Sequence, residues 1–319
     1  PERGHTVGVE TTTGPLGQGI GNGVGMAIAE RMLREQYGTA LCDHRTWVLC
    51  SDGDLMEGVA SEAASLAGHL KLDRLTVIWD DNKITIDGRT DLSFSEDVGA
   101  RFAAYGWHVL HVRDGNDLDD IDTALTQAAA HQDAPTLIVL RTIIGDPAPT
   151  KRDSSKAHGE PLGADEITRT KALLDWPTEP FHVAPEAYTE MAPLAAQGKE
   201  LVQAWEARLA ASPRAAEFRA QLAGTLPDGW ATHLPDLSEE SVASRQASQK
   251  ALAALAPVIP GLAGGSADLG GSNGTNITFG DVFSATSTGP RFHWGIREHG
   301  MAATLNGMAF GIFPIVWIV

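Results

Sequence analysis

The chain has 319 residues, of which 43% are hydrophobic, enough for about two domains with buried cores. Its 24 basic and 41 acidic residues give a net charge of −17, which argues against a nucleic-acid or anionic-membrane partner but not against small phosphorylated substrates. Its two cysteines exclude a disulfide framework, and no segment reaches the roughly 18 apolar residues of a membrane span. We therefore expect a cytoplasmic protein that binds neither membranes nor nucleic acid.

Apolar segments of strand length alternate with helical patterns in the first half of the chain. Residues 19–36 have helical spacing despite several glycines, so we expect close packing against another backbone, with a loose Gly-rich loop as the other interpretation. The alternation predicts a doubly wound α/β fold with a parallel sheet, in which ligands bind at the carboxyl ends of strands. Strands are expected at 46–50, 75–79, 107–112 and 136–140, and helices at 57–70 and 117–131 with an amphipathic stretch at 98–105.

The second half of the chain begins with a loop and helices and then returns to an α/β pattern. We expect a loop at 144–163, helices and connectors at 164–230 with the clearest helix at 200–211, and a linker at 227–238. The second α/β pattern comprises a helix at 241–256 with Ser241 as its N-cap, a strand and turn at 262–269, a helix at 298–310 and a strand at 311–319. The expected domains are residues 1–236 and 237–319.

Two polar clusters stand at neighbouring predicted strand ends, at residues 51–54 and 80–84. Asp52 and Asn82 are 30 residues apart, the length of one strand–helix–strand unit, and adjacent parallel strands lie about 4.8 Å apart. Carboxylate and amide oxygens suit Mg²⁺, and Gly53 would let the backbone approach a phosphate. Ordinary turns are the other interpretation, because Asp, Asn and Gly favour turns.

Six segments extend this pattern over nearly the whole chain. They are Gly-Val-Glu-Thr-Thr-Thr-Gly-Pro-Leu-Gly-Gln-Gly (8–19), Ser-Leu-Ala-Gly-His-Leu-Lys-Leu (65–72), Asp-Asp-Asn-Lys-Ile-Thr-Ile-Asp-Gly (80–88), Lys-Ala-His-Gly (156–159), Gly-Gly-Ser-Ala-Asp-Leu (264–269) and Trp-Gly-Ile-Arg-Glu-His-Gly-Met (294–301). In sequence and order they resemble transketolases, a family of thiamine-diphosphate enzymes. Ser51-Asp52-Gly53…Asn82 resembles the Gly-Asp-Gly…Asn motif of that superfamily, with serine in place of the first glycine.

The resemblance implies a metal site and a cofactor site. Asp52, Asn82 and the carbonyl of Ile84 would hold Mg²⁺, for which Ca²⁺ or Mn²⁺ can substitute, and the metal would bind the diphosphate of thiamine diphosphate. The implied cofactor contacts come from Gly14, Pro15, Leu16, Gly53, Glu57, Asn82, His158 and Asp268.

The resemblance also implies catalytic roles for Glu298 and His158. Glu298 would share a proton with the aminopyrimidine N1′, which favours the imino tautomer that activates the cofactor. On its own it would be interpreted as an acid stabilised at a helix N-terminus, and the two interpretations are compatible. His158 would approach the cofactor and the substrate oxygen, whereas on its own it would pass for a loop histidine. Arg245 and Ser272 match positions that bind the sugar phosphate, although Arg245 alone would be interpreted as a solvated helix residue.

The implied activity is transfer of a two-carbon ketol group from a ketose phosphate to an aldose phosphate, such as xylulose 5-phosphate and ribose 5-phosphate in the pentose phosphate pathway. The implied assembly is a homodimer with shared active sites, in which Glu57 links the two sites. Small residues at 19–27 and 58–68 fit a helix–helix contact between subunits or, alternatively, the core of one chain.

Two other functions stay open: a related ketol transferase such as dihydroxyacetone synthase, and a catalytically silent truncated chain. The family's histidine pair would precede residue 1, and its pattern beyond Phe310 is not recognisable here. We therefore expect an internal fragment that lacks the N-terminal histidines and the C-terminal half.

Overall fold

A parallel sheet of four strands forms the centre of the first half of the chain. The computed structural model describes residues 2, 4–238, 241–310 and 316–318. The strand order is β1-β2-β6-β5. The strands are β1 (Thr46–Ser51), β2 (Leu75–Asp81), β5 (His108–Val112) and β6 (Thr136–Arg141). All four lie within two residues of the predicted bounds, and the predicted α/β fold with a parallel sheet is confirmed.

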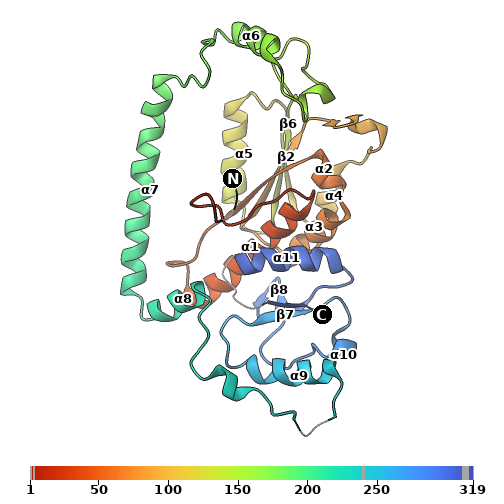
Figure 1. Cartoon of the computed structure of the whole chain (residues 1–319), viewed down its shortest axis with the longest axis vertical. Coiled ribbons are helices and arrows are strands. Elements are labelled where there is room, and N and C mark those ends of the chain that lie inside the picture. Colours follow the sequence, from red (N-terminus) through yellow and green to blue (C-terminus); the bar gives the residue numbers. More distant parts are fainter. Residues whose placement is uncertain (1, 3, 239–240, 311–315, 319) are drawn as a thin grey trace.

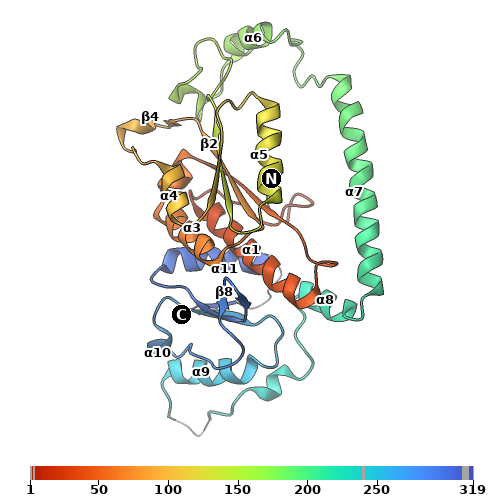
Figure 2. The same cartoon turned by 180° about the vertical axis from the view of Figure 1, so that it is seen from behind.

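Helices cover both faces of this sheet, as its apolar strands require. Figures 1 and 2 show α3 (Gly58–Leu70) and α4 (Val98–Ala104) on one side of the sheet and α5 (Leu118–Ala130) on the other. The helices are α1 (Gln18–Tyr37), α2 (Asp52–Met56), α3 (Gly58–Leu70), α4 (Val98–Ala104) and α5 (Leu118–Ala130). A short hairpin, β3 (Ile84–Thr85) and β4 (Gly88–Arg89), and a 3₁₀ turn, Thr90–Leu92, follow β2.

A helical segment follows the 3₁₀ turn Ser155–Ala157 and leads to the second domain. Its elements are α6 (Ala164–Leu173), α7 (Pro185–Ala211), α8 (Ala215–Leu222) and the 3₁₀ turn Trp230–His233. The α7 helix is longer than the predicted 200–211, because it begins at Pro185, a position where proline costs no hydrogen bond. It runs along one side of the molecule (Figure 1).

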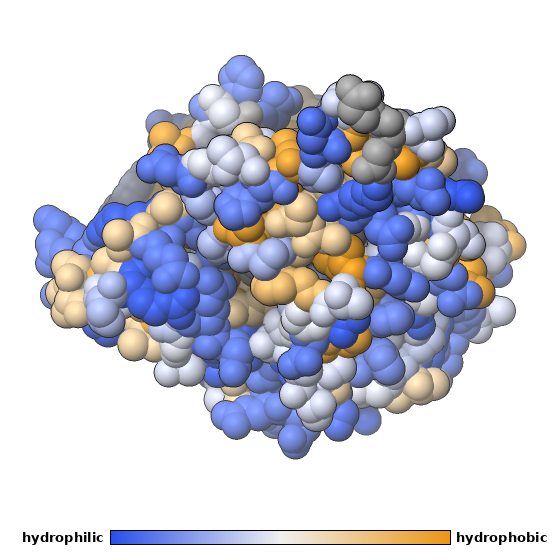
Figure 3. Space-filling model, turned by 90° about the horizontal axis from the view of Figure 1, so that it is seen from below, coloured by the Kyte–Doolittle hydropathy of each residue, from blue (hydrophilic) through white to orange (hydrophobic). Residues whose placement is uncertain are grey.

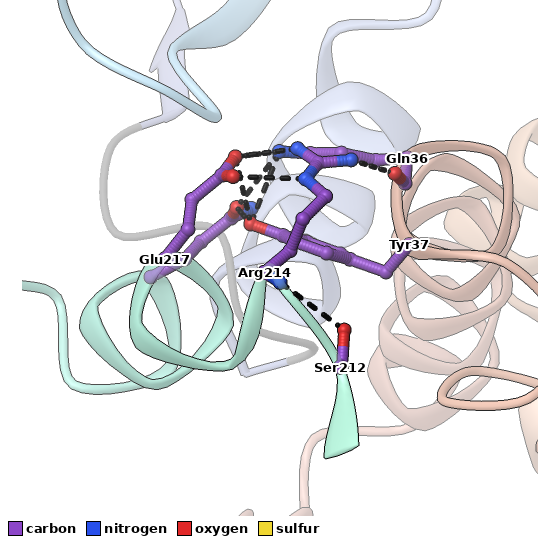
Figure 4. Close-up of polar contacts among 6 residues, drawn as sticks. Gln36, Tyr37, Ser212, Arg214 and Glu217 are labelled. Atoms are coloured by element: carbon purple, nitrogen blue, oxygen red, sulfur yellow. Dashed lines mark hydrogen bonds and ion pairs between the residues drawn. The ribbon is translucent and has the colours of Figure 1, made fainter. Parts of the chain in front are cut away.

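The α8 helix is fastened to the end of α1 by the polar cluster in Figure 4. The Tyr37 hydroxyl donates a hydrogen bond to Gln221 at 2.6 Å. Arg214 pairs with Glu217 at 2.5 Å, and its guanidinium lies 4.5 Å from the centre of the Tyr37 ring. These contacts hold the linking helices against the first domain.

A second, smaller parallel sheet has the order β10-β7-β11. Its elements are α9 (Ser244–Leu255), β7 (Ala263–Ser266), α10 (Gly270–Asn273), β8 (Phe283–Ser284), β9 (Ser287–Thr288), β10 (Arg291–His293), α11 (Glu298–Phe310) and β11 (Val316–Ile318). The predicted helix at 298–310 is present with those bounds. The prediction of Ser241 as an N-cap is wrong, because Ala243 occupies the cap and the Gln246 side chain accepts its N–H at 3.2 Å. Residues 311–315 and 319 of the last predicted strand lie outside the described residues.

The two domains meet where α1 packs against α11, with almost no side chain between the helices. A Cβ added at Gly21 would overlap the Ala303 side chain. A Cβ added at Gly25 would overlap the carbonyl oxygen of Thr304, and a Cβ added at Gly307 would overlap the carbonyl oxygen of Asn22. The prediction that the glycines of 19–36 permit close backbone packing is therefore confirmed. The contact lies within one chain, which favours the core interpretation of residues 19–27 over a contact between subunits.

The end of the molecule formed by the second domain is mainly hydrophilic and carries separate hydrophobic areas, some of them in a central hollow (Figure 3). Among the described residues, no helix combines the length and apolar content that crossing a membrane requires. The largest hydrophobic core cluster instead joins both domains and includes Ile20, Leu75, Leu137 and Met308.

One carboxylate is buried on the inner side of α1. Glu30 is 1% exposed and lies 3.0 Å from the Nε of Arg34, which in turn lies 3.5 Å from Asp73. Burial raises the pKa of Glu30 to about 7, against the opposing charges of Arg34 and Arg74, and the negative charges of Asp73 and Asp43 add to the increase. The α1 helix thus contains an acid that is harder to ionise in the folded protein.

Gly25→Ala is expected to destabilise the protein by about 3 kcal/mol, because the methyl group would overlap the α11 backbone and force the helices apart. Gly58→Ala is the matched control, since no atom lies within 4 Å of the Cβ position at that helical glycine. Chemical unfolding monitored by circular dichroism measures both. Equal stability of the two variants would contradict the close contact.

Glu30→Gln is expected to flatten the pH dependence of stability between about pH 4.5 and 7. Folding raises this pKa from 4.5 to about 7, so the folded protein binds more protons than the unfolded chain in that range. The wild-type free energy of unfolding should therefore fall as pH rises through the window, and fall less in the variant. Urea titrations at pH 5 and 7.5 measure this, with Glu35→Gln on the exposed side of α1 as the control. Identical slopes for all three proteins would refute the assignment.

Candidate cofactor and metal site

The carboxyl edge of the larger sheet brings together four acidic or amide side chains, those of Asp52, Asp80, Asp81 and Asn82. Ser51 and Asp80 are paired neighbours on β1 and β2, so the residues that follow them are brought side by side. Asp52 begins α2 and is 2% exposed, and Asn82 is 7% exposed. The Asp52 Oδ2 accepts a hydrogen bond from the Lys83 N–H at 3.0 Å. Asp52 and Asn82 therefore share one buried corner.

The buried corner has the features of a cation site. The Asp52 Oδ1 is buried and has no hydrogen-bond partner among the described residues. Burial, followed by the nearby charge of Asp81, raises the pKa of Asp52 to about 6. The ammonium group of Lys83, on the following segment, lies 2.6 Å from Asp81. A buried carboxylate oxygen without a partner is costly, and a divalent cation with oxygen ligands would satisfy it.

Asn82 and Ile84 form the turn beside Asp52. The Asn82 Oδ1 accepts the Ile84 N–H at 2.9 Å, and its amide nitrogen lies 3.3 Å from Asp80. This turn places the residues of the predicted metal set, Asp52, Asn82 and Ile84, on adjoining segments. The donor set is made of oxygens and fits the predicted Mg²⁺.

The Gly14–Gly17 segment lies over the start of α2. The Asp54 Oδ1 accepts the Gly17 N–H at 2.8 Å, and its other oxygen accepts the Ser51 N–H at 2.8 Å. A Cβ at Gly53 would lie 3.1 Å from the Leu16 side chain, so these residues are nearly in contact. Sequence reasoning assigned no role to Asp54, although the Ser-x-x-Asp spacing at 51–54 is the signature of a capping box.

A cavity of about 740 Å³ continues from this segment toward the second domain. Its lining includes Gly14, Pro15, Leu16 and Glu57 from the predicted cofactor set, and His299 from the first turn of α11. The adjoining Glu298, the first residue of α11, is exposed.

Glu62 explains how the first turn of α11 is held beside this cavity. Its Oε2 accepts the Gly300 N–H at 2.7 Å, which satisfies one of the free amides at the helix N-terminus. Arg297 adds a hydrogen bond to the Ser65 hydroxyl at 3.1 Å. Sequence reasoning missed Glu62, because its partner is 238 residues away.

His158 lies on the long loop that follows β6, just after a 3₁₀ turn, and its side chain is exposed. The loop leaves the same sheet edge as the buried corner. There the Thr142 hydroxyl hydrogen-bonds Asp80, and the Thr142 N–H donates to the Asp81 carbonyl at 3.3 Å.

The remaining predicted residues gather at a different place. Asp268 lines a cavity of about 400 Å³ at the carboxyl ends of β7 and β10. Ser272 lies on the adjoining α10, and Arg245 lies on α9. A Cβ built on Gly274, which follows α10, would lie 2.9 Å from the Arg245 carbonyl oxygen, so the two helices pack closely there. In Figure 1 α9 and α10 lie across α11 from α2. One chain therefore does not bring these three residues to Asp52.

Comparisons with known proteins agree with this architecture. Residues 1–229 match the family model described as "Transketolase, thiamine diphosphate binding domain", and residues 240–319 match "Transketolase, pyrimidine binding domain". The chain belongs to the transketolase family. The expected family is thus confirmed.

Curated transketolases of Geobacillus stearothermophilus and Bacillus subtilis are 49% and 46% identical to this chain, and each match covers 97% of the chain and 48% of the relative. The solved transketolase of Leishmania mexicana superposes with a TM-score of 0.94 at 42% identity, covering 100% of this chain and 49% of that one. A transketolase of Pichia stipitis, described in complex with xylulose 5-phosphate, gives 0.93 at 39% identity, with 98% and 48% covered. The chain spans about half the length of the curated relatives it matches.

Proposed function

We propose that this chain is the cofactor-binding part of a transketolase that uses thiamine diphosphate and Mg²⁺. The reaction is transfer of a two-carbon ketol group from a ketose phosphate to an aldose phosphate, within the cytoplasmic pentose phosphate pathway. The observation that carries the proposal is the buried Asp52 carboxylate, which has an oxygen without a partner among the described residues and lies beside Asn82. It lies in the region matched by the thiamine diphosphate binding domain.

In this proposal the first domain binds the diphosphate end of the cofactor. Asp52, Asn82 and the Ile84 carbonyl hold Mg²⁺, and the backbone at Gly53 approaches a phosphate of the cofactor. Gly14, Pro15 and Leu16 border the rings; this role is supported by the fastening of their segment to α2 through Asp54.

When bound, thiamine diphosphate supplies the nucleophilic carbon and the electron acceptor that ketol transfer needs. Glu298 holds a proton at the aminopyrimidine N1′, and His158 binds the reacting oxygen of the substrate. Glu298 is the first residue of α11, at the end of the helix where acidic side chains are favoured. Glu57 links the two sites of a dimer.

Sugar phosphates are the proposed substrates, bound by Arg245, Ser272 and His158, with Asp268 near the cofactor. The support is the xylulose 5-phosphate complex of the Pichia stipitis relative, together with a cavity at the carboxyl ends of β7 and β10 that Asp268 lines and that Arg245, Ser272 and His158 do not line. The protein has a net charge of −17, so binding of an anion depends on a local cation such as Arg245.

A homodimer with shared sites completes the proposal. Its support is the separation of the elements that carry the predicted residues: α2, which begins at Asp52, lies on one side of α11, and α10, which contains Ser272, lies on the other (Figure 1). A second copy can bring its own Asp268 and Ser272 to the Asp52 corner. Such an interface is expected to be large and apolar.

The direct test is ketol transfer from xylulose 5-phosphate to ribose 5-phosphate, measured with and without thiamine diphosphate and Mg²⁺. Cofactor-dependent transfer is the expected result. Transfer only to other acceptor aldehydes would favour a related ketol transferase such as dihydroxyacetone synthase, and cofactor binding without any transfer would favour a silent chain.

Asp52→Asn is expected to weaken Mg²⁺-dependent binding of thiamine diphosphate by about 3 kcal/mol, or about 100-fold in Kd. The amide keeps an oxygen for the Lys83 N–H, so the turn is retained while the charge is lost. Isothermal titration calorimetry measures the affinity. Asp87→Ala, an exposed acid in the following hairpin turn, is the control. Wild-type affinity in the Asp52 variant would exclude it as a metal ligand.

Mixing an Asp52→Ala protein with a Glu298→Ala protein tests the shared sites. If each site combines Asp52 of one subunit with Glu298 of the other, a mixed dimer has one intact and one doubly altered site, so activity should return. Subunit exchange is verified by mass spectrometry of isotopically labelled protein. Verified exchange with no recovered ketol transfer would show that each site is built within one chain.

A further inference from the structure

The loop between β6 and α6, residues 142–163, leaves the sheet edge that contains Asp52 and carries His158 about three quarters of the way along. Its one regular element among the described residues is the 3₁₀ turn Ser155–Ala157, and loops of this length with so little regular structure are uncommon in compact domains and are usually functional. This one is closed by its own hydrogen bonds. The Asp153 N–H donates to the Ile144 carbonyl at 2.9 Å, and the Lys151 ammonium donates to the Pro161 carbonyl at 2.9 Å.

A single buried carboxylate ties the middle of this loop to α6. Glu166 is 4% exposed, and its Oε1 accepts the N–H groups of Thr150 at 2.6 Å and Lys151 at 3.2 Å. Its Oε2 accepts the Thr150 hydroxyl at 3.0 Å and Arg169 at 2.7 Å. The hydrogen bond from the Thr150 N–H is the main reason that the pKa of Glu166 lies below its ordinary value.

The needs of α6 alone do not account for these contacts. Asp165 occupies the same first turn, is exposed, and can provide the negative charge that the helix N-terminus favours. Glu166 is instead buried against the loop. Burying a charged side chain costs free energy unless several hydrogen bonds compensate, and three of its four contacts go to Thr150 and Lys151.

The same arrangement constrains the segment next to His158. Gly145 has a φ of 71°, and a Cβ built on it would lie 2.8 Å from the Ala157 side chain, so the start of the loop packs against the residue before His158. Thr150 and Lys151 lie between these two points. Fixing them to α6 therefore restricts the conformations open to the chain that presents His158.

We propose that Glu166 is a positioning residue, which holds the loop 142–163 so that His158 is presented in one place. The proposal rests on the proposed function, in which His158 contacts the cofactor and the substrate oxygen. A site residue on a loop acts efficiently only when neighbouring contacts fix its position, and Glu166 provides such contacts from a regular element.

Limited proteolysis tests the first part of this proposal without any activity measurement. Trypsin can cut the loop after Lys151, Arg152 and Lys156. In Glu166→Ala the initial rate of these cuts, measured by mass spectrometry of the peptides, should rise at least about tenfold. Asp165→Ala, the matched control in the same helical turn, should keep the wild-type rate. Wild-type cleavage of this loop in the Glu166 variant would overturn the proposal.

Glu166→Gln is the conservative variant and also serves if the alanine variant does not fold. Its amide oxygen can still accept the Thr150 and Lys151 N–H groups, whereas its NH₂ group would face Arg169. We expect cleavage close to the wild-type rate. Cleavage as fast as in the alanine variant would show that the hydrogen bonds to the loop are not what Glu166 contributes.

A double-mutant cycle with His158→Ala tests the second part. Glu166→Ala should lower kcat/KM for ketol transfer by between about 10- and 100-fold in the wild-type background, and by less than about twofold when His158 is already alanine. Equal losses in both backgrounds would show that Glu166 does not act through His158. If the wild-type protein shows no ketol transfer, the proposed function and the role of His158 fail, while proteolysis still decides whether Glu166 holds the loop.

Discussion

The contact between α1 and α11 decides where every other part of the site can lie. The helices approach so closely that Gly21, Gly25 and Gly307 leave no room for a Cβ. This approach places the first turn of α11 against α3, where Glu62 accepts the Gly300 N–H. It also sets the second sheet on the far side of α11 from α2, as both views show (Figures 1 and 2). Close packing of α1 and α11 thus brings the first turn of α11 to the cavity beside Leu16 and Glu57, and it keeps the cavity lined by Asp268 away from that place.

The sheet edge adds a second constraint, which is electrostatic. Parallel strands end together, so the register of the sheet brings Asp52, which follows β1, into one corner with Asp80 and Asp81, which end β2. Lys83 is near but lies against Asp81, and the backbone N–H of Lys83 satisfies only one oxygen of Asp52. The fold therefore keeps a buried carboxylate that is only partly compensated, an arrangement typical of sites that gain their stability from a bound ion.

Local patterns predicted the larger sheet well, because each strand is a short apolar run bounded by turns and β1 to β6 form one alternating unit. The start of α7 could not be predicted in the same way, since the helix is exposed along nearly its whole length and contains Pro193, so no apolar stripe marks residues 185–199. The glycines of α1 indicated a close backbone contact, but nothing local to them identifies α11 as the partner. Asp54, Glu62 and Glu166 were missed for a related reason: each acts on a backbone N–H that is distant in sequence or lies in an irregular loop.

The charge of the corner bears on the order in which ligands can bind there. A diphosphate is an anion, and the corner proposed to bind it contains the carboxylates of Asp52, Asp80 and Asp81, while α2 is only five residues long and offers a weak dipole. Repulsion of this kind is strong where water is excluded, so the anion needs a cation between itself and Asp52. The same cation would satisfy the Asp52 Oδ1, which has no hydrogen-bond partner among the described residues. In the proposed site the metal would offset the negative charge of Asp52 that repels the diphosphate, and the diphosphate would add oxygen ligands for the metal. Binding of the two is therefore coupled through the buried side chain of Asp52.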